Sequence, residues 1–280
     1  MGMEVKDVIA TMVCLIIGIG GPNRTVDGRK VQCCIALTKE FGLVRLFAAF
    51  DDIMRSVSLW DEVKACVIKT SKDVRDESWK LLSIEVIGKI DSSHEKRGIL
   101  NAIVLRCGSE DPIDYQNDRK LSIAVAVPVK QTLSVTMKSQ DSEDADDGFV
   151  AQCNQPNRAC IGWESCSGTR HNLACVGHEV FEGLRKNPSA PMRVFENMHT
   201  HDQDWDKWLV LGNTQHRNVW VIVHVHRLKK TTPERIEQSS WITGGDPNGW
   251  PYLGKEAMRA KAAEFNPQKT LFTMFDMTAT

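Results

Sequence analysis

The sequence predicts a mainly β protein of the α+β class. A small barrel or sandwich of strands is followed by a second β-rich, loop-rich part with short helices. The 280 residues are 42% hydrophobic and 25% charged, which is ordinary for a globular protein. The first half consists of short apolar runs separated by turn residues. After an acidic stretch at residues 139–148 the composition shifts toward Cys, His and Trp, so we expect two folding units.

The first apolar run, Val8 to Gly20, is expected to form a buried strand that ends in a turn. It is shorter than the roughly 20 apolar residues that a membrane-spanning helix needs. A signal peptide carries a basic segment before its apolar run, whereas Glu4 and Asp7 precede this one. We therefore expect no membrane association.

Further strands of the first half are predicted from short apolar stretches bounded by Gly, Asp or Ser. They cover Val31 to Thr38, Leu43 to Phe50, Val63 to Thr70 and Leu121 to Val129. Ser78 to Ile90 fits neither a helical nor a strand period, so its structure stays open. In the charged segment just before it, Arg75 is expected to brace a turn by pairing with Asp73 or Glu77.

The acidic stretch Ser139 to Gly148 is the best linker in the chain. It contains five acidic residues, no apolar residue larger than Ala, and neither period. An EF-hand loop would need Asp or Asn at alternate positions, and Ala145 breaks that pattern. We therefore predict one domain over residues 1–138, a linker over 139–148 and a Cys/His/Trp-rich β domain over 149–280.

The second domain is expected to mix strands with short helices. Gly177 to Lys186 predicts a short helix, and Trp205 to Leu211 with Val219 to His226 predicts a hairpin. Lys255 to Phe265 is expected to be helical, and Thr270 to Phe275 to form a last strand.

Charge and cysteine content limit the classes of function. The chain has 35 Lys and Arg against 36 Asp and Glu, a formal charge of -1, which argues against coating nucleic acid by bulk electrostatics. Any such binding must be local. Nine cysteines at irregular spacings indicate a reducing compartment, and we expect a cytoplasmic protein.

A group of thiols with one imidazole could surround a tetrahedral zinc ion, whose usual ligands are Cys and His. Structural zinc sites usually present Cys pairs two to four residues apart, and this group has no such pair. Buried thiols without a metal are therefore the alternative. The members are Cys153, Cys160, Cys166, His171 and Cys175.

Histidines further along the chain give a second metal hypothesis. His224 and His226 are two apart on a predicted strand, so their imidazoles should share one side of the hairpin, opposite the valines at 221, 223 and 225. With His199 and His201 they could hold zinc or another divalent ion that activates water. The alternative is that these histidines lie on a solvent-exposed face of the hairpin.

Cations and indoles on the hairpin predict a surface for single-stranded nucleic acid, on which aromatic rings stack bases and cations follow the backbone. Because Trp in a β protein is often a core residue, burial of these indoles is the alternative. The predicted binding residues are Arg45, Arg217, Trp220, Arg227, Lys229 and Lys230.

Short segments in both halves carry a resemblance to known proteins. They are Gly42 to Leu46, Trp60 to Val63, Asp73 to Lys80, Cys166 to Gly168 with His171, Glu179 and Val180 with Arg185, Leu211 to Asn213 and Trp220 to Val223. In these segments the chain resembles a group of poorly characterised bacterial and phage proteins with one or two inferred oligonucleotide/oligosaccharide-binding (OB) barrels. The resemblance implies an OB-like barrel in the first domain and an association with nucleic acid, and it supplies no reaction. The chain departs from that group at Gly177-His178-Glu179, where an Asp-Trp-Glu run is expected.

Three functional hypotheses follow. The first is a protein that binds single-stranded or structured nucleic acid without catalysis. The second is a metal-dependent hydrolase or nuclease that uses the histidines. The third is a phage-type interaction or inhibitor module that binds a host or partner protein.

Overall fold

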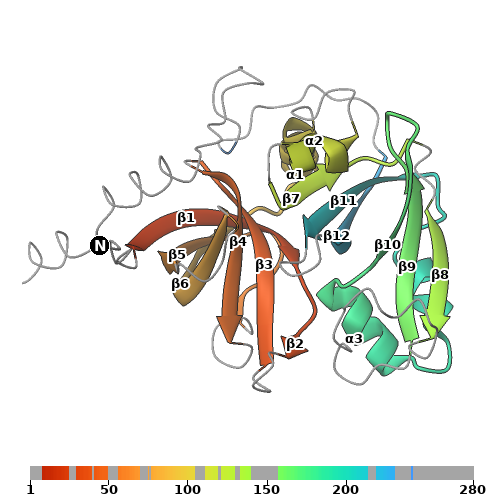
Figure 1. Ribbon diagram of the computed structural model, residues 1–280, viewed down its shortest axis with the longest axis horizontal. Coiled ribbons are helices and arrows are strands. Elements are labelled where there is room, and N and C mark those ends of the chain that lie inside the picture. Colours follow the sequence, from red (N-terminus) through yellow and green to blue (C-terminus); the bar gives the residue numbers. More distant parts are fainter. Residues whose placement is uncertain are drawn as a thin grey trace, which may run out of the picture.

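The computed structural model shows a mainly β protein, which confirms the predicted class (Figure 1). It describes residues 8–24, 30–39, 41–49, 56–69, 75, 77–104, 111–118, 121–129, 133–139, 157–213, 219–230 and 241. The strands are β1 (Val8–Ile19), β2 (Asn23–Arg24), β3 (Lys30–Thr38), β4 (Gly42–Ala49), β5 (Asp61–Lys69), β6 (Ser78–Lys89), β7 (Ile123–Ala126), β8 (Ser134–Ser139), β9 (Asn157–Glu164), β10 (Arg170–Ala174), β11 (Trp205–Asn213) and β12 (Trp220–Lys229). The helices are α1 (Ser93–Val104), α2 (Pro112–Asp118), α3 (His178–Lys186) and α4 (Pro191–Asn197).

Five strands of the first half pair in a ring. The pairing runs from β1 through β5, β6, β4 and β3 back to β1, and only β4 with β6 is parallel. Alternation along β5 shows why one face points inward, because Val63, Ala65 and Val67 are buried while Lys64 between them is exposed. The first apolar run of the sequence forms strand β1, as predicted; most of it is buried, whereas Ile9 and Val13 are exposed.

The segment whose period was open, Ser78 to Ile90, supplies β6. Its pairing with β5 shifts register between Glu62 and Val63 and again between Cys66 and Val67. Each bulge adds a residue on one strand and reverses which residues face inward beyond it. The sequence of β6 therefore follows no single period, although all of it is strand.

The second half contains two three-stranded sheets, in the orders β10, β9, β8 and β12, β11, β7. A single parallel bridge between Cys175 and Ile222 connects them. The predicted hairpin is confirmed as the antiparallel pair β11 and β12, and the predicted helix as α3. Gly177 precedes α3, and a Cβ there would lie only 2.7 Å from the carbonyl oxygen of Val223. This close approach requires glycine.

Sheet pairing crosses the predicted domain boundary. β7 pairs with β11, and β8 pairs with β9, so strands on both sides of residues 139–148 belong to the same sheets. The predicted linker therefore connects two neighbouring strands rather than two separate sheets. Residues 140–156, and the predicted elements after residue 254, lie outside the described residues.

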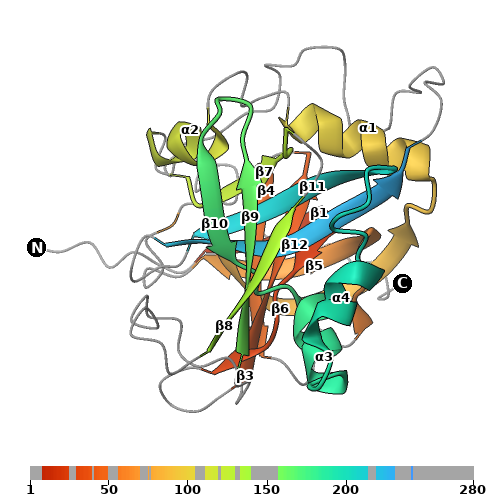
Figure 2. The same ribbon diagram turned by 90° about the vertical axis from the view of Figure 1, so that its right-hand side faces the viewer.

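The ring and the second group of strands share an apolar core. It includes residues from the outer side of β1 and β3, from the inner face of α1, and from β11 and β12: Leu15, Ile17, Ile35, Leu37, Ile99, Leu100, Trp208, Val210, Val221 and Val223. Figure 2 shows α1 beside the end of β12, over one end of this core. Burial on both sides explains why these strands are almost continuously apolar.

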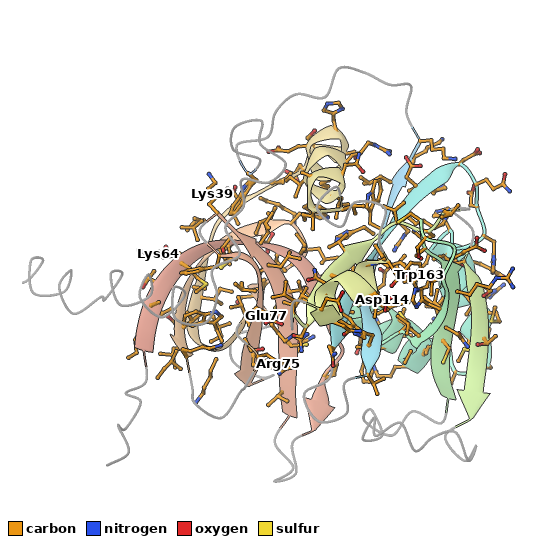
Figure 3. All side chains as sticks on the ribbon, turned by 45° about the horizontal axis from the view of Figure 1, so that its top comes forward. Lys39, Lys64, Arg75, Glu77, Asp114 and Trp163 are labelled. Atoms are coloured by element: carbon orange, nitrogen blue, oxygen red, sulfur yellow. The ribbon has the colours of Figure 1, made fainter. Side chains whose placement is uncertain are left out.

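A polar joint, formed by Arg45, Arg75, Glu77, Ser122 and Asn213, closes the same interface. The Arg45 guanidinium donates to the carbonyl oxygens of Asn213 and Ser122, each at 2.7 Å. Glu77 accepts hydrogen bonds from the backbone N–H of Ser122, at 2.8 Å, and from its hydroxyl. Arg75 also donates to the Asn213 carbonyl, at 3.0 Å. Figure 3 shows Arg75 and Glu77 where the ring meets the second group.

Candidate functional site

Two of the residues predicted to bind nucleic acid, Trp220 and Arg45, are buried in the structure. Trp220 is 5% exposed, and its indole Nε1 donates to Asn117 at 3.0 Å. Arg45 is also 5% exposed, since its guanidinium is held in the polar joint. A base cannot stack on a buried indole, and a phosphate cannot reach a buried guanidinium, so neither residue can play the predicted role.

The remaining predicted cations differ in whether their charge is already paired within the protein. Arg227 makes a two-pronged ion pair with Glu179 of α3, with one of its contacts at 2.9 Å. Such a pair positions α3 against β12 and occupies the guanidinium. Lys229 and Lys230 are exposed at the end of β12, as a binding role requires. Arg217 lies outside the described residues.

The predicted cysteine site does not assemble in the part of the chain that is described. Cys160 and Cys175 are buried, whereas Cys166 is exposed in the turn between β9 and β10, and Cys153 lies outside the described residues. Burial raises the pKa of Cys175 to about 12. This thiol therefore stays protonated near neutral pH in the folded chain. The described cysteines are free thiols.

The four histidines of the second metal hypothesis divide into two places. His224 and His226 share one side of β12, with ring centroids 4.5 Å apart, but they are only 5% and 4% exposed, so they do not lie on a solvent-exposed face. His199 instead stacks on Trp205, and His201 is exposed. Among the described residues no group of three or more His, Cys, Asp or Glu side chains could hold a metal ion.

A bulge explains where the β12 side chains point. Val210 pairs with His224 and Leu211 with Ile222, so Val223 is an extra residue on β12. Val221 and Val223 consequently join the core shared with the ring, while Val225 faces the other core. The predicted placement opposite the histidines is therefore confirmed for Val225 and wrong for Val221 and Val223.

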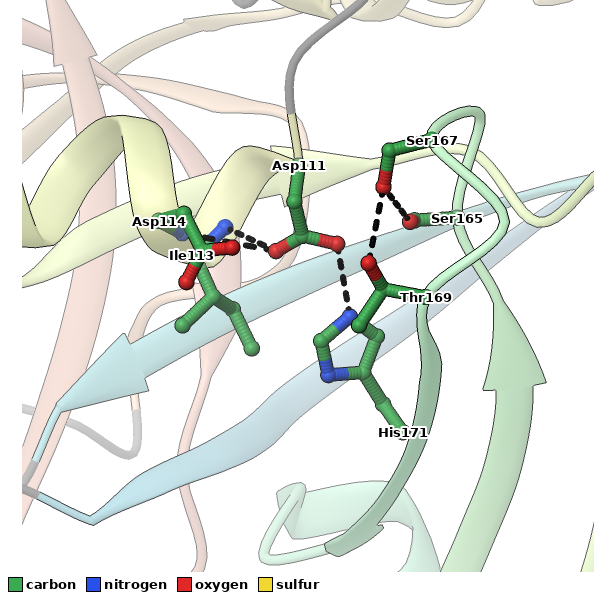
Figure 4. A network of polar contacts seen from close by, with 7 residues as sticks. All are labelled: Asp111, Ile113, Asp114, Ser165, Ser167, Thr169 and His171. Carbon is green, nitrogen blue, oxygen red and sulfur yellow. Dashed lines mark hydrogen bonds and ion pairs between the residues drawn. The ribbon is translucent and has the colours of Figure 1, made fainter.

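The fifth member of the cysteine group, His171, belongs to a polar network with Asp111 (Figure 4). Its Nε2 lies 2.8 Å from the Asp111 carboxylate, and its ring stacks on Trp163. The other Asp111 oxygen accepts the backbone N–H groups of Ile113 and Asp114, at 3.0 and 3.3 Å, and so caps α2.

Burial acts to raise the pKa of Asp111, but hydrogen bonds from Ser165, His171 and the Ile113 backbone, with the charge of His171, bring it below its ordinary value. The hydroxyls of Ser165, Ser167 and Thr169 bond in series, at 2.8 and 2.9 Å. In this network the Ser165 hydroxyl bonds to Asp111 rather than to His171. The network therefore lacks the contact between nucleophile and base that a hydrolase triad has. Its role is to hold α2 against β10.

Replacing Asp111 with alanine is expected to lower the free energy of unfolding by about 2 kcal/mol, because α2 loses its cap and His171 loses its partner. Urea unfolding of the purified variant measures this. Asp114→Ala is the matched control in the same helical turn: its side chain is exposed and its backbone N–H remains. An equal loss in both variants would mean that general helix electrostatics, and not the Asp111 contacts, produce the effect.

Positive side chains gather around the first turns of α1 and the end of β12. We call Lys89, Lys96, Arg97, Lys229 and Lys230 the α1 cation strip. Arg97 connects its two parts, since its guanidinium donates to the Lys229 carbonyl oxygen at 2.8 Å and pairs with Asp206. Lys89 lies 3.2 Å from Asp61 at the start of β5.

Indoles beneath the strip hold two of its cations in place. The Lys96 ammonium lies 5.6 Å from the centroid of the Trp60 ring, and the Arg97 guanidinium lies 5.4 Å from that of Trp208. Both rings are buried, so they fix the cations from below. Partial burial lowers the pKa of Lys96; Asp91 opposes this shift and Lys89 adds to it.

The sequence analysis did not identify Lys89, Lys96 or Arg97. Their signal was the run Ser92-Ser93-His94-Glu95-Lys96-Arg97, which contains a capping box followed by two cations. One hydrogen bond of the box is present, because the Ser92 hydroxyl accepts the N–H of Glu95 at 3.3 Å.

Comparison with known proteins leaves the family open. No protein-family model and no curated protein matches the chain. One solved structure, described as the molecular basis for abrogation of activation of pro-inflammatory cytokines, is 7% identical, with a TM-score of 0.32 over 81% of this chain and 97% of the other. A murine DNA binding protein bound with double-stranded DNA is 10% identical, with a TM-score of 0.31 over 81% of this chain and 99% of the other. Within the described residues no helix has the length and apolar character that crossing a membrane demands.

Proposed function

We propose that the protein binds nucleic acid, single-stranded or structured, through the phosphate backbone at the α1 cation strip. The observation that carries this is the gathering of Lys89, Lys96, Lys229 and Lys230 around α1 and the end of β12, with Arg97 between them. It is a local concentration of positive charge on a chain whose formal charge is -1, as local binding requires.

An OB-like architecture supports a single-stranded ligand. The ring β1, β3, β4, β6, β5 has the strand order of an OB barrel, with the parallel pair in the expected position. The second half repeats this order if β7 and β8 count as one interrupted strand. From β8 the pairing continues to β9 and then to β10, and the bridge between Cys175, just after β10, and Ile222 connects in parallel to β12. β12 pairs with β11, and β11 pairs with β7, which closes the order. We therefore propose two OB-like units, divided between α1 and α2.

The strip would recognise phosphates rather than bases. Its indoles lie beneath the cations and are buried, so they offer no face to a base. Asp61, Asp91 and Asp206 lie among the cations and partly neutralise them. The proposal therefore implies binding that tolerates many sequences and weakens steeply as salt rises.

A triple variant tests the proposal: Lys96→Gln, Lys229→Gln and Lys230→Gln together. Fluorescence anisotropy of labelled single strands and of an RNA hairpin, titrated at several salt concentrations, is the measurement. We expect the wild type to bind at low salt, and the slope of log affinity against log salt to become shallower by about 2 in the variant, since each lost phosphate contact removes about 0.7.

The control carries neutral substitutions elsewhere. Lys80→Gln with Lys186→Gln removes exposed positive charge on β6 and α3, away from the strip. This control should keep the wild-type slope. If the wild type binds none of these nucleic acids at low salt, or if the control weakens binding as much as the triple variant, the proposal is refuted.

A further inference from the structure

Exposed apolar side chains concentrate on two strands of the ring. Ile9 and Val13 of β1 share the outer face with Lys64, whereas Val86 of β6 is in register with the buried Val63 and lies on the other face. Five of the seven large hydrophobic residues that are exposed in the described structure lie on β1 and β6: Ile9, Val13, Leu82, Val86 and Ile87. Scattered single residues of this kind are normal, but a cluster on neighbouring strands marks an interaction surface. Ile87, the most exposed of the five, is 51% accessible.

β5 lies between these strands and makes the surface continuous. It pairs with β1 on one side and with β6 on the other, and Ile68 and Cys66 on β5 are half-buried. Ile9 of β1 and the exposed Lys80 of β6 both pair with Ile68, and Leu82 is the extra residue of the bulge between Leu81 and Ser83. Figure 1 shows β5 and β6 on the side of the molecule away from β8, β9 and β10. This face, formed by β1, β5 and β6, is therefore distinct from the interface between the two halves.

The charges in the middle of this face point to its occupant. Lys64 on β5 and Glu85 on β6 are exposed and directly paired in register, and Lys64 also pairs with Val13 of β1. Figure 3 shows Lys64 on the outer side of the ring. One cation and one anion side by side in an apolar surface are self-complementary. A two-fold axis parallel to the strands, running between β5 and β6, sets Lys64 of each copy against Glu85 of the other.

We propose that this face binds a second copy of the chain in a two-fold symmetric dimer. The same rotation sets Ser83 of β6 against Cys66 of the other copy. Each copy thus covers apolar surface and gains two intermolecular ion pairs. Of the α1 cation strip only Lys89 lies on β6, and it pairs with Asp61 rather than with Lys64 or Glu85, so the dimer contact does not use the residues proposed to bind nucleic acid.

Sedimentation of the full-length protein over a range of concentrations tests the dimer. We expect a mass approaching twice the chain mass of 31.4 kDa at high concentration. Ile87→Lys should reduce this to the mass of a single chain. Val129→Lys and Met192→Lys are matched controls, since both residues are exposed hydrophobics outside the face, and they should leave the dimer intact.

Charge reversal gives the sharper test. Lys64→Glu alone and Glu85→Lys alone should each be monomeric, because each places like charges across the axis. An equimolar mixture of the two variants should dimerise, since glutamate 64 of one chain then meets lysine 85 of the other and the native Glu85 meets the native Lys64. The lysine and glutamate within one chain cannot produce this recovery. A monomeric wild type at every concentration, a dimer unaffected by Ile87→Lys, or a mixture that stays monomeric would each overturn the proposal.

Discussion

Replacing Arg45 with methionine is expected to lower the free energy of unfolding by about 3–5 kcal/mol. The guanidinium donates to two carbonyl oxygens, one on Ser122 and one on Asn213, and both lie at the interface between the ring and the second group of strands. Methionine has a similar length but no donor, so each carbonyl loses a charge-assisted hydrogen bond, and Ser122 keeps only the N–H of Asn213 while Asn213 keeps only Arg75 among the contacts described. Urea unfolding followed by tryptophan fluorescence measures the loss.

Two further variants assign the cause. Arg45→Lys keeps the charge but cannot reach both carbonyls in the same geometry, so we expect it to lose about 2 kcal/mol. Arg185→Met removes an exposed guanidinium that pairs with Glu182 on α3, and it should leave the unfolding midpoint unchanged. If Arg45→Met and Arg185→Met behave alike, the polar joint does not stabilise the interface.

The contrast between these arginines shows what the sequence could and could not predict. Arg45 lies on an apolar strand and was expected on a nucleic-acid surface, but its carbonyl partner on Asn213 is 168 positions away. Arg75 was expected to brace a local turn with an acidic neighbour, yet it too reaches Asn213. Local sequence carries no information about such distant partners.

Elements with a strong local pattern were predicted well. The hairpin β11 and β12 and the helix α3 follow directly from their apolar periods and turn residues. The same periods did not predict the strand β6 or the faces on which the β12 side chains lie. Each strand contains a bulge, and one extra residue reverses the alternation of side chains beyond it. The helix α1 was missed although its capping box was present, and with it the cations of the strip.

The histidine pair shows the same limit for the candidate site. The spacing of His224 and His226 correctly places both rings on one side of β12. It could not indicate that β1 and Trp60 cover that side: the Nε2 of His226 donates to the Ile17 carbonyl oxygen at 2.6 Å, and its ring lies against Trp60. A pair that resembles two metal ligands in sequence is therefore part of the core.

This burial predicts a pronounced loss of stability in acid. Burial, reinforced by the charge of Arg227, lowers the pKa of His224 to about 3. Burial also lowers the pKa of His226; the charges of His224, Arg227 and Lys96 act in the same direction, while the hydrogen bond to Ile17 opposes them. Both imidazoles are thus neutral in the folded protein at pH values where the unfolded chain has already bound a proton. Stability is full above about pH 6.5 and falls as the pH decreases from there toward 3.

The variant His224→Leu isolates this effect, because leucine has a comparable volume and does not titrate. Near pH 7 we expect the variant to be less stable than the wild type by about 1 kcal/mol, since its shape differs from that of the imidazole. Each unit by which the folded pKa lies below the unfolded value corresponds to about 1.4 kcal/mol, so His224 costs the wild type about 4–5 kcal/mol by pH 3. The two stability curves should therefore cross between pH 6.5 and 3, with the variant more stable on the acid side.

Urea unfolding at a series of pH values measures both curves. His201→Gln, at an exposed position, is the control and should follow the wild type throughout. Parallel curves for His224→Leu and the wild type would mean that His224 is protonated in the folded protein, which its place between β1 and β12 does not allow.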